Sequence, residues 1–102
     1  MARIVGVFEN GGMLHEVVAQ LRLNGVEQLT VVDPGDDLDQ SMQQLHAIGT
    51  PDAQVAEYRA RLGDQRWLLL VQLSDIDLPM AQQALRNGQA LDVDILPDST
   101  AV

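Results

Sequence analysis

The sequence predicts an α+β fold, because a strand–helix–strand pattern occurs twice within 102 residues, once near each end. Apolar segments at residues 3–8 and 28–33 flank an amphipathic stretch, and the same order returns from residue 66 onwards. Both amphipathic stretches close on Asn-Gly, at Gly25 and Gly88, where glycine can adopt the left-handed conformation that ends a helix. Two such units predict a ferredoxin-like βαβ(αα)βαβ sandwich with a mainly antiparallel four-stranded sheet.

The first unit is defined by its apolar spacing. Residues 3–8 are apolar on both faces of the predicted strand, which is typical of a central strand. A turn then leads into a helix over 12–24, whose core-facing residues recur at helical spacing. These residues are Leu14, Val17, Val18 and Leu21. The second strand, 28–33, ends at the turn signal Asp33-Pro34-Gly35.

Residues 36–63 form an insertion between strands 2 and 3, where a minimal ferredoxin-like fold has a hairpin. Apolar spacing predicts helices over about 36–47 and from Thr50 to Gly63, and Ile48-Gly49 ends the first of them. The second helix is expected to have Thr50 as its N-cap and Pro51 at its first position. The apolar stripes are Leu38, Met42 and Leu45 on one helix, and Val55, Tyr58 and Leu62 on the other. Two antiparallel helices let strand 3 run antiparallel to strand 2.

The second unit begins with the most hydrophobic segment, a predicted strand over 66–73 that must be buried on both faces. A helix over 78–87 follows. The last strand, 91–95, alternates leucine, valine and isoleucine with aspartate, as expected of a half-exposed edge whose outward carboxylates discourage edge pairing. These features predict the strand order 4-1-3-2 in one domain, residues 1–96, followed by a loose tail, 97–102.

Composition restricts the class of protein. Fifteen acidic residues outnumber six arginines, and the net charge of −9 repels nucleic-acid backbones and anionic membranes. The absence of cysteine excludes disulfides, thiolate metal sites and cysteine nucleophiles. No apolar run approaches the roughly 18 residues that span a bilayer, and the N-terminus lacks the layout of a signal peptide. A cytoplasmic protein that binds neither nucleic acid nor membrane is expected.

The polar residues do not form a recognisable catalytic set. His15 and His46 are far apart in sequence, and neither has a neighbouring nucleophile. The serines have no nucleophile-elbow context: Ser41, Ser74 and Ser99. A group of four acids lacks the spacing of a calcium loop and is interpreted as a turn followed by helix-capping residues. These acids are Asp33, Asp36, Asp37 and Asp39. We therefore expect no catalytic residue, metal or cofactor, and a protein that is not an enzyme.

One family resemblance follows from the order of motifs. A Gly-Val-Phe first strand ending at Phe8, the helix start Gly49-Thr50-Pro51, a tyrosine at position 58 and the apolar strand 68–71 are similar to those of a bacterial general stress protein family, the heat-induced YflT-like domain. The resemblance covers roughly residues 4–96. The chain departs from the family at Asp64-Gln65-Arg66-Trp67, where members often have Gly-Gly. The resemblance implies the fold and the cytoplasmic location, and it carries no catalytic residues over. The missing catalytic set, the acidic surface and the central strands that are apolar on both faces lead us to expect a stress-associated protein that acts through protein–protein contacts, including self-association.

Two further hypotheses concern ligands and assembly. Asn10, Gly11 and Gly12 follow a strand and open a helix, so backbone N–H groups there could bind an anion. The same turn looks like that of an ACT regulatory domain, and an amino-acid-sensing module is the alternative function. Separately, the two main helices of a ferredoxin-like sheet cover only one face. The other face must be covered by the inserted helices or by a second subunit, and we expect a homodimer.

Overall fold

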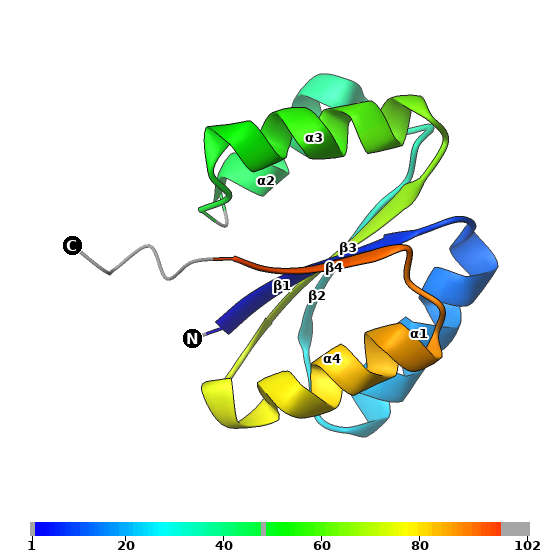
Figure 1. Ribbon diagram of the computed structural model, residues 1–102, viewed down its shortest axis with the longest axis vertical. Helices are drawn as coiled ribbons and strands as arrows, with labels where there is room; N and C mark the ends of the chain where they lie inside the picture. The colour runs from blue at the N-terminus through cyan, green and yellow to red at the C-terminus, as the bar shows by residue number, and fades with distance from the viewer. Residues whose placement is uncertain (1, 48, 97–102) are drawn as a thin grey trace.

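Among the residues that the structure describes, four strands form one antiparallel sheet, and helices lie on both of its faces (Figure 1). The computed structural model describes residues 2–47 and 49–96, so the predicted tail 97–102 and the expected role of Ile48 in ending a helix lie outside the described residues. The elements are β1 (Ala2–Phe8), α1 (Gly11–Leu23), β2 (Gln28–Val32), α2 (Leu38–Ala47), α3 (Asp52–Gly63), β3 (Trp67–Leu73), the short 3-10 helix η1 (Asp75–Asp77), α4 (Leu78–Asn87) and β4 (Asp92–Leu96).

The strand order is β2-β3-β1-β4, which is 4-1-3-2 when it is counted from the other edge. All three neighbouring pairs are antiparallel, with Val5 opposite Leu70 in the central pair and Val5 opposite Asp94 at the β4 edge. The two strands that are apolar on both faces, β1 and β3, are the central ones. This agrees with the rule that a strand without a polar face must be covered on both sides.

The inserted helices cover the second face of the sheet. Figure 1 shows α2 and α3 on one side of the sheet, and α1 and α4 on the other. The buried residues accordingly form two clusters, one on each face. The argument for a homodimer from an uncovered sheet face is therefore wrong, because a single chain covers both faces. Two helices suffice because their stripes centre on large buried side chains, Leu45 from α2 and Tyr58 and Leu62 from α3.

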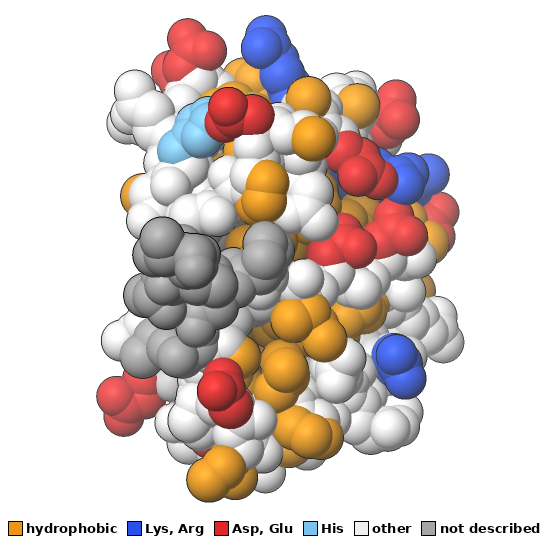
Figure 2. Space-filling model, turned by 60° about the vertical axis from the view of Figure 1, so that its left-hand side comes forward, with side chains coloured by type: hydrophobic (Ala, Val, Ile, Leu, Met, Phe, Trp, Pro, Cys, Tyr) orange, Lys and Arg blue, Asp and Glu red, His pale blue; other side chains and the backbone are white. Residues whose placement is uncertain are grey.

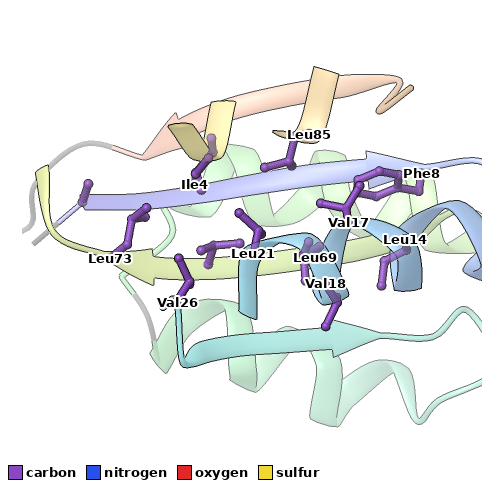
Figure 3. Packing of buried hydrophobic residues seen from close by; sticks show 13 residues of the cluster. Ile4, Phe8, Leu14, Val17, Val18, Leu21, Val26, Leu69, Leu73 and Leu85 are labelled. Carbon is purple, nitrogen blue, oxygen red and sulfur yellow. The ribbon is translucent and has the colours of Figure 1, made fainter. Parts of the chain in front are cut away.

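The larger cluster lies between the sheet and the helices α1 and α4 (Figure 3). It contains the whole predicted stripe of α1 and the residues of β1 and β3 that point to this face. Leu73 belongs to this cluster as well. It shares the face of Leu69 and Val71, since β3 continues to Leu73 without a break and alternate residues of a strand point to the same side.

Two expected helix ends differ in the structure. Thr50 is not an N-cap: α3 begins at Asp52 after Pro51, and the buried Thr50 hydroxyl has no hydrogen-bond partner within the described residues. Its backbone N–H instead donates to Leu45 O at 3.1 Å and helps to close α2. At the end of α4, Gly88 keeps a negative φ and Gln89 adopts the left-handed conformation at φ 63°. Glycine is still needed at 88, because a Cβ there would overlap Val17 of α1.

Candidate functional site

The turn Asn10–Gly12 is built by contacts within the chain. The Asn10 side chain is the N-cap of α1, and its Oδ1 accepts a hydrogen bond from the backbone N–H of Met13 at 2.9 Å. Gly11 lies against the indole of Trp67, where an added Cβ would be 2.8 Å from Cζ2. Asparagine and glycine at positions 10 and 11 are thus explained by capping and by close packing. Ligand binding at this turn stays a prediction.

The two glycines of this turn should respond differently to the same substitution. Gly11→Ala should lower the free energy of unfolding by about 1–3 kcal/mol, because the new methyl group overlaps the Trp67 ring. Gly12→Ala is the matched control: its Cβ would meet only the Asn10 side chain, at 3.4 Å, and it should be neutral or stabilising by up to about 1 kcal/mol. Urea denaturation followed by circular dichroism measures both. Equal stability of the two variants would contradict this assignment.

The acids at the start of α2 form local hydrogen bonds. Asp33 Oδ1 accepts from the N–H of Gly35 at 2.7 Å, and Asp37 Oδ1 accepts from the N–H groups of Asp39 and Gln40 at 2.9 and 3.2 Å. These bonds confirm the interpretation of this segment as a turn followed by a helix cap. Within the described part of the chain, three or more potential metal-binding side chains do not come together.

The histidines and serines are not brought together. His15 lies on α1, where its ring contacts Trp67 edge-on at 5.9 Å between centroids. His46 lies on α2, across the sheet from α1, with Nδ1 3.6 Å from Asp52 Oδ1. The hydroxyl of Ser41 donates to a backbone carbonyl of the preceding turn, and that of Ser74 donates to Asp77 Oδ2 at 2.9 Å. Ser99 lies outside the described residues.

The structure does assemble polar residues at the edge strand β4. The hydroxyl of Tyr58, on α3, donates to Asp94 Oδ2 at 2.7 Å, and Arg61 Nη2 lies 2.9 Å from Asp92 Oδ2. Tyr58 and Arg61 are three residues apart and so lie on one face of α3, while Asp92 and Asp94 are two apart on one face of β4. The expectation that these carboxylates point outward is wrong, because α3 packs above them and supplies a partner to each.

This contact joins the inserted helices to the edge of the sheet. Tyr58 is only 1% exposed, and burial together with its hydrogen bond to the Asp94 carboxylate raises the pKa of its hydroxyl above the usual range. The charge of Asp94 opposes a second negative charge at this position, so the tyrosine remains a neutral donor. The contact therefore fixes the orientation of Asp94 relative to the strand.

The opposite face of β4 is apolar. Val93 packs on the edge of the larger hydrophobic cluster, and Ile95 is 47% exposed. Ile76, in η1, is 90% exposed. Figure 2 shows hydrophobic side chains gathered on the half of the molecule that carries α4, with carboxylates next to them on the side of α3. The edge strand thus presents two different faces, one acidic and one apolar.

The sequence pattern predicted that aspartates and apolar residues alternate in β4, but it did not predict that Tyr58 and Arg61 contact the aspartates. A signal was present: Tyr58 lies on the predicted core-facing stripe with Val55 and Leu62, and Arg61 follows it by one turn at the edge of that stripe. Polar groups on a core-facing stripe need buried partners, and the aspartates of an adjacent edge strand are the available acceptors.

Comparison of the sequence with models of protein families finds no match, and comparison with curated proteins finds none either. The similarity to the general stress protein family therefore stays a prediction. Among the described residues, no helix combines the length and the apolar character needed to cross a membrane.

Proposed function

We propose that this protein is not an enzyme and acts by binding another protein through the edge strand β4. The observation that supports this most directly is the half-exposed Ile95 on a strand whose outer edge has no partner strand in the described structure. Unpaired strand edges are templates for pairing with another chain, and natural proteins usually block them. Here the edge carries the half-exposed Ile95 on one face of the strand and carboxylates on the other.

The finer assignments belong to the same proposal. The strand order, with one helix in each βαβ unit, supports a ferredoxin-like sandwich in which α2 and α3 are an insertion. The motif order at Phe8, Gly49–Pro51 and Tyr58 supports membership of the heat-induced general stress proteins. The lack of cysteine supports a cytoplasmic location.

The proposal is tested by placing a photo-crosslinking amino acid at position 95 and, as a control, at the exposed position 44 of α2 in the full chain. Irradiation in the native cells should give an adduct of defined mass from position 95 only. The captured protein is then purified, and its binding to the unmodified chain should saturate. The same adducts from both positions, or none from position 95, would contradict a β4 binding surface.

Self-association is measured in the same preparation. Sedimentation velocity at micromolar concentration distinguishes an 11.1 kDa monomer from a dimer. The homodimer expected from the sequence now requires a surface other than a sheet face, since both faces are covered within one chain.

A further inference from the structure

We infer that the partner of β4 is an extended segment in which basic and apolar residues alternate, and that it adds to the sheet as a fifth strand. This inference rests on the proposed protein-binding function and specifies the chemistry of the partner.

The backbone of β4 is available for pairing. Within residues 2–47 and 49–96, β4 pairs only with β1, from Asp92 opposite Val7 to Leu96 opposite Arg3. Each residue of a strand directs its N–H and C=O groups to one side, and successive residues alternate between the two sides of the strand. An extended peptide can bond to the free side, which is the common mode of recognition by strand addition.

The side chains of β4 determine which peptide fits. Asp92 and Asp94 face α3, whereas Val93 and Ile95 face the side of α4. In an added strand, residues directly opposite one another lie on the same face of the sheet. A complementary strand therefore carries lysine or arginine opposite the aspartates and apolar residues opposite Val93 and Ile95.

A second copy of this chain fits this edge poorly. To keep both faces continuous, two β4 strands in antiparallel pairing must place even-numbered residues opposite even-numbered ones. When all five residues of both strands are paired, Asp94 faces Asp94 of the other copy and Asp92 faces Leu96, and like charges directly opposite one another are destabilising. Each copy also carries a net charge of −9. Charge complementarity thus favours a basic segment over self-pairing.

The existing contacts of the carboxylates leave room for a basic partner. Asp92 is held by Arg61 through Oδ2, and its side chain remains 41% exposed. Asp94 accepts from Tyr58 through Oδ2. A carboxylate has about four acceptor positions, so one donor does not saturate it. Tyr58 and Arg61 instead fix the two carboxylates in one row, which reduces the entropy lost when a partner binds.

The test uses a fluorescein-labelled heptapeptide of alternating lysine and valine, titrated into the full-length protein and followed by anisotropy. We expect saturable binding, with amide shifts in NMR spectra concentrated in β4. Three control peptides are matched in length: glutamate in place of lysine, the same composition in two blocks, and N-methylation of alternate backbone nitrogens on the pairing edge. All three should bind at least about tenfold more weakly, the last because it loses backbone hydrogen bonds while keeping its charge.

Variants of the protein locate the contact. Asp92→Asn should raise the Kd for the alternating peptide by about 1.4- to 5-fold, and Asp92→Asn with Asp94→Asn by about 2- to 30-fold. Asp39→Asn, an equal loss of charge on the exposed surface of α2, should leave the Kd unchanged. Circular dichroism of each variant verifies that it is folded.

Other outcomes would overturn the inference. These are NMR amide shifts located at β2, binding of the N-methylated peptide as tight as that of the alternating peptide, or a dimer that pairs through β4. If the peptide fails to bind while position 95 still crosslinks to a protein, the proposed function stands and the partner chemistry is wrong. If position 95 gives no adduct either, both are wrong.

Discussion

Replacing Tyr58 by phenylalanine should lower the free energy of unfolding by about 1–3 kcal/mol at neutral pH, because Asp94 then loses a charge-assisted hydrogen bond in a partly buried position. The ring of phenylalanine keeps the packing of α3 on the sheet, so the loss is confined to the hydroxyl. Asp94→Asn is the complementary variant: it retains an acceptor for Tyr58 and should be less destabilising than Tyr58→Phe. Urea denaturation at pH 7 measures both variants.

The same contact predicts a particular dependence on alkaline pH. The pKa of Tyr58 is raised above 10.0 in the folded state, whereas the unfolded chain ionises near 10. Its contribution to stability is therefore complete below about pH 10 and is lost as the pH rises towards the folded pKa, at about 1.4 kcal/mol per pH unit. Tyr58→Phe should remove this dependence. Tyr58 is the only tyrosine, and the chain has no lysine or cysteine side chain to titrate nearby.

Tyrosinate absorbance gives an independent measurement. In the folded protein the single tyrosine should stay protonated well above pH 10, and its absorbance should rise only with unfolding as judged by circular dichroism. Ionisation near pH 10 without loss of structure would show that the hydroxyl is accessible and that the contact with Asp94 contributes little.

The local pattern of apolar residues was sufficient to predict the helices and strands, but it was insufficient to predict the contacts of Asp92 and Asp94 in β4. Apolar periodicity predicts which residues share a face, and it correctly separates Ile4 and Phe8 from Val5 and Val7 in β1. It does not say what covers that face. The direction of Asp92 and Asp94 depends on where the insertion packs, and this is determined by contacts between residues more than thirty positions apart, such as Tyr58 and Asp94.

The left-handed helix ends illustrate the same limit. Gly25 has the expected positive φ of 87°, and its N–H donates to Arg22 O at 3.0 Å to close the end of α1. Gly88 was expected to behave in the same way, yet its lack of a side chain serves the close approach of α4 to Val17. The two glycines thus serve different needs, a backbone angle at Gly25 and the approach of a neighbouring atom at Gly88, and only the packing distinguishes them.

Gly6, in the centre of β1, is a further position where a neighbouring atom leaves no room for a Cβ. A Cβ there would overlap Leu85 Cδ2 and would lie 3.0 Å from the ring of Phe8. Gly6→Ala should lower the free energy of unfolding by about 1–3 kcal/mol, since Leu85 is fully buried and α4 must shift to admit the methyl group. Gly63→Ala, at the end of α3 with open space around it, is the control and should be neutral or slightly stabilising.

A double-variant cycle separates this steric effect from a change in the backbone. Leu85→Ala alone should lower the free energy of unfolding by about 2–5 kcal/mol because of the cavity that it leaves. With that cavity present, the added methyl group at position 6 has room, so Gly6→Ala in the Leu85→Ala background should cost little or even be favourable. Guanidinium denaturation followed through the single tryptophan, Trp67, measures all four proteins. Additive losses would mean that Gly6 is required for its backbone, whereas a coupling above about 0.5 kcal/mol identifies the contact between β1 and α4 as the constraint.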